Sequence, residues 1–363
     1  MGPDAPWLAP LAGFSDLPFR LLCRENGAAV ACTEMVSAKG LLVDFKKDEV
    51  VRGKSFPPAG SGAAPRPPEA YKIKVDLLQD AAGAELHGAS AELLRTVPED
   101  APLVVQLFGA EPDCVAAAAR EAMGRGFLFF DVNMGCSVPK VMKTGAGAAL
   151  LRDPDKAAAV GRALFRAAGE GRAGCKLRLG PDAASPVYAD LARRLEDEGA
   201  AWLTLHPRHA RQGFAGSADC AALEKLARSV NIPVLASGDL FNAEEAVKRL
   251  ETGVRGVMFA RGALADPGIF RRYLDLRAGR SPQAYTGAVG AAFLLRHARL
   301  ARELSAERAG RSGIPASLLK MRGTAPRYLR AFPGVGRFRA ALARCAGWDE
   351  LYALAREFFP DAV

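Results

Sequence analysis

The residues best suited to chemistry lie in one short segment, where an apolar run ends in an amide and a single thiol. Asn133 directly follows the mainly apolar run 128–132, Cys136 comes three residues later, and Gly135 stands between them. The carboxyl end of a parallel strand is where α/β proteins place reactive side chains. Cys136 has no second cysteine near it for a metal or redox pair, so its chemistry would depend on one thiol. A buried, inert cysteine is the alternative that spacing alone leaves open.

A basic, glycine-containing stretch follows this cysteine. Lys140 and Lys143 precede Gly145 and Gly147. Glycine gives the backbone freedom that a tight loop needs, and lysine is common at surfaces that meet anions. We therefore expect a loop that carries Cys136 and offers positive charge beside it.

Eight apolar runs separated by helix-like stretches predict the elements that position these residues. The runs are residues 7–10, 29–33, 103–108, 128–132, 174–177, 202–206, 234–237 and 256–259. The helix-like stretches include residues 115–124, 155–168, 186–198, 220–229 and 243–252. Eight such units over about 270 residues are typical of an α/β fold of the closed (β/α)8 TIM-barrel type. A doubly wound open sheet is the alternative, but no GxGxxG follows the first run.

The remaining chain divides into an insertion and a helical end. The Pro- and Gly-rich residues 56–68 cannot form a regular element, so we interpret about 46–86 as an insertion after the second strand. After about residue 280 the strand pattern stops, and residues 290–306, 338–346 and 349–358 have helical patterns. We therefore predict a catalytic barrel over residues 1–280 and a small all-α domain over residues 281–363.

Positive charge gathers in that helical end. The net charge of the chain is +9, and residues 281–363 carry 13 Lys and Arg against six Asp and Glu. Residues 308–344 hold nine basic side chains and no acidic one. A run this long without an acid favours a polyanionic partner, and nucleic acid is the first choice.

Composition narrows the class of protein further. No run of about 18 apolar residues suggests a transmembrane helix, and the first residues do not have the pattern of a secretory signal. The seven cysteines are scattered and form no CxxC, which argues against a disulfide framework and a structural zinc site. We expect a cytoplasmic monomer with no metal and no contact with a membrane.

Polar side chains follow the predicted strands at the end where a barrel gathers its site. They are Gln106, Asn133, Cys136, Lys176, Arg178, His206, Arg208, the turn Ser237, Gly238 and Asp239, and the turn Ala260, Arg261 and Gly262. Each alone could be a structural residue of the rim. The two glycine turns after strands seven and eight are where barrels bind phosphate, and Arg261 would add charge-assisted bonds. Lys176 could neutralise negative charge on an electron-accepting ring. The set therefore suits the phosphate-bearing flavin mononucleotide (FMN) better than a nicotinamide dinucleotide.

These motifs, in this order, carry a resemblance to a known family. They are residues 9–20, 33–38, 106–109, 133–136, 150–154, 176–178, 206–208, 237–239 and 260–262. Over about residues 7–345 the chain resembles the bacterial tRNA-dihydrouridine synthases, flavoenzymes with an FMN-binding barrel and a helical domain that grips tRNA. The resemblance implies reduction of specific uridines in tRNA to 5,6-dihydrouridine, with NADPH as the expected electron donor.

The resemblance also implies roles for individual residues. Cys136 would donate the proton, and Asn133 would contact the reacting base. The expected FMN contacts are Pro10, Leu11, Ala12, Gln106, Lys176, His206, Ser237, Gly238, Asp239, Ala260 and Arg261. The residues expected to contact the RNA are Asn133, Lys140, Lys143, Arg178, Arg208, Arg322 and Arg327.

Two other functions remain open at this point. An FMN barrel that acts on a free small molecule, like dihydroorotate dehydrogenase or old yellow enzyme, would use the same flavin residues but would leave the basic end unexplained. An RNA-binding or chaperone-like protein on an inactive barrel would not need Gln106, Lys176 and Cys136 together. Bound flavin would separate this last alternative from both enzymes.

Overall fold

The computed structural model describes residues 5–52, 88–304 and 313–360, and its centre is a closed barrel of eight parallel strands. The barrel strands are β1 (Trp7–Leu8), β2 (Val30–Cys32), β4 (Leu103–Phe108), β5 (Phe129–Met134), β6 (Ala173–Arg178), β7 (Leu203–His206), β8 (Val234–Ser237) and β9 (Gly256–Phe259). Pairing of β1 with β9 and of β2 with β4 closes the ring. The predicted (β/α)8 barrel is therefore confirmed, and the open sheet is excluded.

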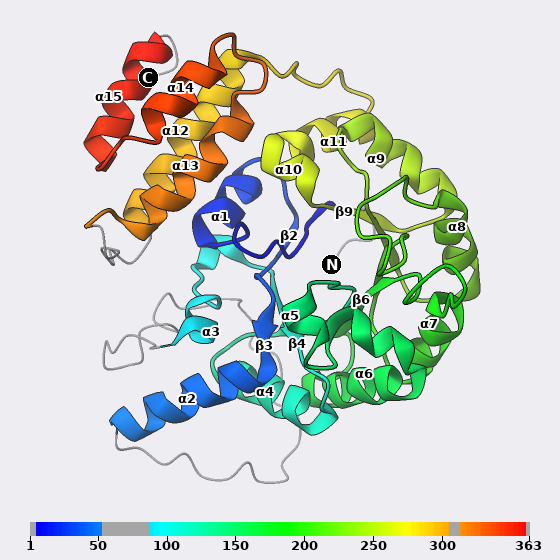
Figure 1. The fold of residues 1–363 in the computed structure, drawn as a ribbon. Coiled ribbons are helices and arrows are strands. Elements are labelled where there is room, and N and C mark those ends of the chain that lie inside the picture. The colour runs from blue at the N-terminus through cyan, green and yellow to red at the C-terminus, as the bar shows by residue number, and fades with distance from the viewer. Residues whose placement is uncertain (1–4, 53–87, 305–312, 361–363) are drawn as a thin grey trace.

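Helices form a ring around these strands (Figure 1). They are α1 (Leu17–Glu25), α2 (Ala38–Arg52), α4 (Pro112–Gly124), α6 (Pro154–Ala168), α7 (Tyr188–Asp197), α8 (Cys220–Ser229), α9 (Ala243–Arg249) and α11 (Ile269–Arg277). Short helices α3 (Ala89–Glu92), α5 (Pro139–Met142) and α10 (Arg261–Ala265) lie in the connections. Because the strands are covered on both faces, nearly every strand residue is buried, as a parallel barrel requires.

Local sequence explains where several of these helices begin. Asp16, Asp153, Asp219 and Asn242 are the N-cap residues of α1, α6, α8 and α9, and each side chain accepts a hydrogen bond from a backbone N–H of the first turn. Such caps satisfy donors that a helix start leaves free. They also end the loops that hold the polar residues after the strands.

The segment between β2 and β4 differs in part from the prediction. A short strand not predicted from sequence, β3 (Val36–Ser37), pairs with the end of β4. Residues 46–52, assigned above to the insertion, belong to α2. The remainder of that predicted insertion, residues 53–86, lies outside the described residues.

Within residues 278–304 and 313–360, four helices follow the barrel: α12 (Gly287–Leu304), α13 (Ala316–Tyr328), α14 (Val335–Leu342) and α15 (Trp348–Phe358). They lie together at one side of the ring, as Figure 1 shows in yellow to red. The segment 278–286, where the sequence placed a domain boundary, contains no helix or strand. The helices share a hydrophobic cluster with Leu17, Leu21 and Leu22 of α1. The predicted helical C-terminal region is therefore confirmed, with α13 as an additional helix.

None of the described helices has the length and apolar character needed to cross a membrane.

Candidate active site

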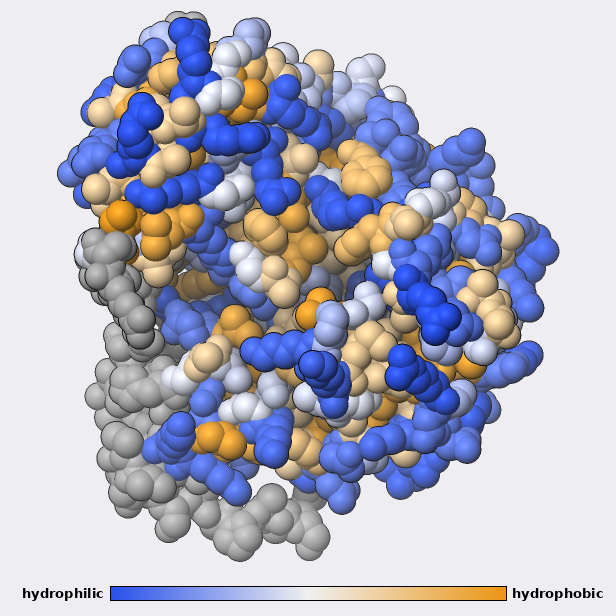
Figure 2. Space-filling view, in the orientation of Figure 1, coloured by the Kyte–Doolittle hydropathy of each residue, from blue (hydrophilic) through white to orange (hydrophobic). Residues whose placement is uncertain are grey.

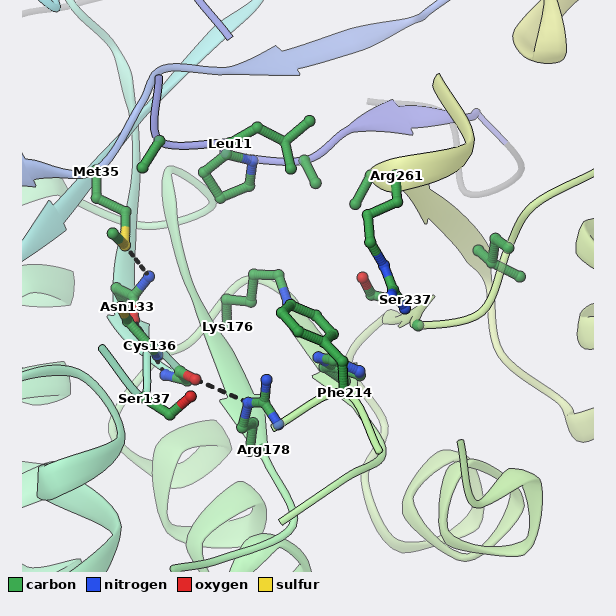
Figure 3. Close-up of a pocket in the computed structure, with 18 of the residues that line it drawn as sticks. Leu11, Met35, Asn133, Cys136, Ser137, Lys176, Arg178, Phe214, Ser237 and Arg261 are labelled. Carbon is green, nitrogen blue, oxygen red and sulfur yellow. Dashed lines mark hydrogen bonds between the residues drawn. The ribbon is translucent and has the colours of Figure 1, made fainter. Parts of the chain in front are cut away.

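A pocket opens at the carboxyl ends of the barrel strands, and the predicted polar residues converge there (Figure 3). Its walls include these residues of the prediction: Pro10, Leu11, Ala12, Asn133, Cys136, Lys176, Arg178, His206, Ser237, Gly238, Asp239, Ala260 and Arg261. Hydrophobic residues gather near the centre of the face that Figure 2 shows, with hydrophilic residues around them. The site thus combines apolar walls with a few polar groups, as small-molecule sites do.

Hydrogen bonds hold both the N–H groups and a carbonyl group of the loop that carries Cys136. Asn133 Oδ1 accepts hydrogen bonds from the backbone N–H groups of Gly135 at 3.1 Å and Cys136 at 2.8 Å. The Cys136 carbonyl accepts from Ala148 N at 2.9 Å. Gly147 has a φ of +63°, and a Cβ there would lie 2.7 Å from the same carbonyl. The half-buried thiol is therefore presented to the pocket by a held backbone.

A buried amide and carboxylate lie beneath this loop, inside the barrel. Gln106 Nε2 donates to Asp131 Oδ2 at 2.7 Å, and Asn133 Nδ2 donates to Gln106 Oε1 at 2.7 Å. Gln106 does not line the pocket itself but is completely buried below Asn133. Burial raises the pKa of Asp131 to about 7, against the opposing effects of the Gln106 hydrogen bond, the Lys176 charge and the indole N–H of Trp202.

Lys176 supplies positive charge to the pocket wall. Removal of its ammonium group from solvent, aided by the charge of Arg178, lowers the pKa of Lys176 to about 8, although Asp131 opposes this shift. The side chain is therefore mainly protonated at neutral pH. It can offer a cation to an electron-rich ligand at the bottom of the pocket.

His206 stays neutral, and its neighbours define its tautomer. Burial and the charges of Lys176, Arg178, Arg208 and Arg261 lower the pKa of His206 to about 2. Arg208 Nη1 lies 3.2 Å from His206 Nε2, and since a guanidinium can only donate, Nε2 accepts and Nδ1 carries the proton. His206 can therefore donate one hydrogen bond from Nδ1 at any working pH.

Two glycines let the backbone approach closely at the turns after β8 and β9. Gly238 has a φ of +97°, and a Cβ there would lie 2.5 Å from His206 Cδ2. A Cβ on Gly262 would lie 2.2 Å from the Leu240 carbonyl oxygen. Side chains are thus excluded from both turns, and Gly262 lies in the first turn of α10, which begins at Arg261 and whose first N–H groups have no intrahelical partner. This is the arrangement in which barrels cradle a phosphate.

An ion-pair cluster joins the loops after β7, β8 and β9. Asp239 accepts two hydrogen bonds from Arg208, at 2.8 and 2.6 Å, and one from Arg261 at 3.1 Å. Burial alone would raise the pKa of Asp239, but these arginines and the N–H of Ala218 hold it below its ordinary value. Arg208, expected to contact RNA, is 2% exposed and its guanidinium is engaged within the protein.

Arg178 connects the cysteine loop to the loop after β7. Its guanidinium donates to the carbonyls of Gly135, His209 and Gly213 at 2.8–3.0 Å. Phe214 follows in that loop, 60% exposed, with its ring 4.4 Å from the Arg261 guanidinium carbon. Figure 3 shows Phe214 extending across the pocket between Lys176 and Ser237.

The other predicted RNA contacts lie outside this pocket. Lys140 and Lys143 are exposed in and after α5, beside the Cys136 loop. Arg322 on α13 is half-buried and donates to the Cys345 carbonyl. Arg327, exposed on the same helix, lies 5.1 Å above the ring of Phe14 in the loop after β1. Of the basic run 308–344, Arg308 and Arg311 lie outside the described residues.

Sequence reasoning missed several residues of the site, among them Asp131 and Phe214. Asp131 stands two positions before Asn133 in the same strand, so the two side chains share the inner face, and an acid within an apolar run was a signal for it. Phe214 is an aromatic residue between two loop glycines, Gly213 and Gly216. Its position over the pocket depends on the fold of the loop after β7, which the sequence pattern does not define.

Comparison with known proteins identifies the family of the chain. A sequence model of the family described as dihydrouridine synthase (Dus) matches residues 7–52 and 81–359. The unmatched residues 53–80 fall inside the segment that the sequence analysis assigned to an insertion.

Curated relatives match over most of their length. The chain is 31% identical to a "Probable tRNA-dihydrouridine synthase 1" of Synechocystis over 92% of this chain and 80% of the relative. It is 30% identical to a "Probable tRNA-dihydrouridine synthase" of Mycobacterium tuberculosis, over 98% and 84%. It is also 30% identical to a "tRNA-dihydrouridine synthase B" of Pseudomonas aeruginosa, over 99% and 94%. The chain belongs to the dihydrouridine synthase family.

Proposed function

We propose that this chain reduces specific uridines in tRNA to 5,6-dihydrouridine, with bound FMN, NADPH as electron donor and Cys136 as proton donor. The observation that carries the proposal is that Asn133 and Cys136 face the same pocket as Lys176, His206 and the two glycine turns. Membership of the family and the names of the relatives support tRNA as the substrate. An enzyme for a free small molecule would share the pocket but would not need the basic helical end.

The residues of the pocket fit a phosphate-bearing flavin. At Gly238 and Gly262 a Cβ would collide with His206 and with the Leu240 carbonyl, so close packing holds the backbone of the two turns after β8 and β9, where barrels bind a phosphate. Arg261, 38% exposed at its side chain, lies beside these turns and can supply charge. Lys176 and the Nδ1 proton of His206 offer a cation and a neutral donor to the ring system. Gln106, buried below the pocket, would orient the Asn133 side chain by accepting its hydrogen bond.

Reduction of uracil requires a hydride at one carbon of the C5–C6 bond and a proton at the other. A reduced flavin, when bound, supplies the hydride. The thiol of Cys136 gives its proton to the second carbon, and solvent returns a proton to the sulfur before the next turnover. The hydrogen bonds that Asn133 makes to the Cys136 loop keep this thiol at one place in the pocket wall. Arg178 holds the same loop through the Gly135 carbonyl.

The target base of a folded RNA must leave its stack to enter the pocket. Exposed Lys140 and Lys143 lie beside the Cys136 loop, and Arg327 lies over Phe14 next to Leu11 and Ala12 of the pocket wall. These exposed cations can neutralise the RNA backbone and hold it in register. We assign Arg208 to the support of Asp239 rather than to the RNA, because its guanidinium is buried and paired.

The test is a reaction of the purified chain with FMN, NADPH and unmodified tRNA, followed by mapping of dihydrouridine. Cys136→Ala should lower uridine reduction by about 10²- to 10⁴-fold, the usual contribution of a general acid, while flavin binding and NADPH oxidation persist. Cys114→Ala is the matched control, because Cys114 is also half-buried but lies on α4. Full activity of Cys136→Ala would remove the thiol from the mechanism. A folded chain that binds no flavin after incubation with FMN would refute the proposal as a whole.

A further inference from the structure

A continuous chain of hydrogen bonds runs from a buried carboxylate to the backbone of the cysteine loop. Asp131 Oδ2 accepts from Gln106 Nε2, and Gln106 Oε1 accepts from Asn133 Nδ2. Asn133 Oδ1 then accepts from the N–H groups of Gly135 and Cys136. Each link measures 2.7–3.1 Å, so every bond of the chain is within ordinary hydrogen-bond length.

The two ends of this chain define its direction. The backbone N–H groups of Gly135 and Cys136 can only donate, so the Asn133 atom that faces them must be oxygen. The Asn133 amide nitrogen therefore faces Gln106, which must present its own oxygen. The Gln106 nitrogen is left facing position 131, where only an acceptor completes the series. An aspartate provides that acceptor, and the indole N–H of Trp202 is near enough to its carboxyl to favour the ionised form, although no hydrogen bond of ordinary geometry reaches its other oxygen.

Because the three side chains are buried, a reversal of the hydrogen-bond direction would be costly. Asp131, Gln106 and Asn133 are 2%, 0% and 5% exposed, so water is not at hand to replace a lost partner. Gln106 and Asp131 are opposite each other in the register of β4 and β5, and Asn133 follows two residues later on the same face. A reversed amide anywhere in the chain would leave two like groups facing each other in a dry interior.

The same carboxyl is a poor choice for stability alone. Burial raises the pKa of Asp131 to about 7, which means that the folded barrel disfavours its ionised form. An apolar residue would pack at this position without that penalty. A polar group kept in such a place requires another reason, and its hydrogen bond to Gln106 supplies one.

We propose that Asp131 is a positioning residue that holds the backbone of Cys136 in place through Gln106 and Asn133. This inference rests on the proposed function, because that function gives the position of the thiol its importance. The carboxylate touches neither substrate nor cofactor in this account. It determines the orientation of two amide side chains and thereby the acceptor that the cysteine loop meets.

Exchange of the two polar groups tests the direction of the chain. Gln106→Glu sets a second carboxyl group against Asp131, and at alkaline pH, above the pKa of Asp131, the two carboxylates repel and the link to Asn133 is disturbed. Hydrogen exchange of all variants is therefore compared at that pH, where the two groups cannot share a proton. In the double variant Gln106→Glu/Asp131→Asn, the amide at 131 donates to the carboxylate at 106, whose other oxygen still accepts from Asn133. The double variant should therefore recover what the single variant loses.

The readout is backbone amide hydrogen exchange of a peptide that covers residues 133–138, measured on the full chain with and without FMN. Exchange at Gly135 and Cys136 should become about tenfold faster in Gln106→Glu, roughly the factor that one intramolecular hydrogen bond contributes. It should return close to the wild-type rate in the double variant. Amides within β4 and β5 should change much less, because a positioning role is local.

Thr204→Val is the matched control, since Thr204 is 0% exposed in β7 and its hydroxyl has no hydrogen-bond partner among the described residues. Unchanged exchange in Gln106→Glu, or a double variant as fast as the single one, would overturn the inference. Equal acceleration in Thr204→Val would also overturn it, because any disturbance of the barrel would then suffice. Since the exchange needs neither tRNA nor turnover, a failed uridine assay with an intact exchange pattern would count against the function alone.

Discussion

Replacement of Gly238 by alanine tests whether the turn after β8 is built to bring the backbone against His206. The backbone φ of Gly238 is +97°, a region that residues with a Cβ seldom adopt. An ideal Cβ at this position lies 2.5 Å from His206 Cδ2 and 3.0 Å from His206 Nε2. Both distances are too short, so either the turn or the imidazole must move.

The expected loss has two parts. The left-handed backbone costs a residue with a Cβ roughly 1–2 kcal/mol. Movement of the imidazole breaks the contact between Arg208 Nη1 and His206 Nε2, and a hydrogen bond from a charged group is worth about 1.5–3 kcal/mol. Gly238→Ala should therefore lower the free energy of unfolding by roughly 2.5–5 kcal/mol. It should also weaken FMN binding by at least about tenfold, because the proposed donor and phosphate cradle both shift.

Gly169→Ala separates backbone strain from collision. Gly169 follows α6 with a φ of +87°, and a Cβ there would meet nothing within 4 Å. Urea unfolding monitored by circular dichroism gives the stability of both variants, and quenching of flavin fluorescence gives the dissociation constant for FMN. The Gly169 variant should show only the strain, with wild-type affinity for FMN.

Equal stability of the two variants, together with wild-type FMN affinity of Gly238→Ala, would refute this reasoning. It would mean that the turn after β8 relaxes freely and that His206 is not held where the structure places it. Loss of FMN affinity in both variants would instead show that general destabilisation, not the contact at His206, controls cofactor retention.

Three further outcomes follow from described contacts. Asp100→Ala should lower the free energy of unfolding by about 3–5 kcal/mol in urea melts, because it leaves the buried guanidinium of Arg20, 2.8 Å away, without its charge partner; a loss below 1 kcal/mol would contradict this. Between pH 5 and pH 8 the free energy of unfolding of the wild type should fall by roughly 3 kcal/mol relative to Asp131→Asn. The reason is that the Asp131 carboxyl keeps its proton to about pH 7 in the folded protein but loses it near pH 3.9 in the unfolded chain. Parallel pH profiles of the two proteins would contradict the raised pKa. Arg327→Ala should flatten the salt dependence of tRNA binding by about one unit of slope, and Arg193→Ala, on outer helix α7, should leave it unchanged; two identical slopes would place the RNA contact elsewhere.

The barrel could be predicted because each of its strands has a strong local signal. Residues 103–108, 220–229 and 256–259 were predicted with the bounds that the structure has, since apolar runs and caps mark both ends. The strand-end residues were predicted to meet for a topological reason, because parallel strands of one barrel all end at one face. That rule alone was enough to predict that Cys136 and Lys176 lie at the same end of the barrel.

The remainder depends on contacts between distant segments. Helix α13 contains Gly323, Thr324 and Pro326, so its local propensity is weak, and packing against α12 and α14 stabilises it. In the sequence, Arg208 follows a strand end just as an arginine exposed to RNA could. Only its approach to Asp239, 31 positions later in the chain, shows that it is buried. Tertiary placement of this kind has no periodic signal in the sequence.

The packing of α1 has a consequence for how the chain can be divided. Leu17, Leu21 and Leu22 belong to the cluster of α12–α15, although α1 follows the first strand of the barrel. Lys320 of α13 also pairs with Asp16 at 2.8 Å, at the start of α1. The helical end of the chain thus covers the leucine side chains of α1, the first helix of the barrel, and keeps them from solvent. A chain shortened at residue 280 would uncover a leucine face and become prone to self-association, so the two halves are one unit for truncation, fusion or exchange between relatives.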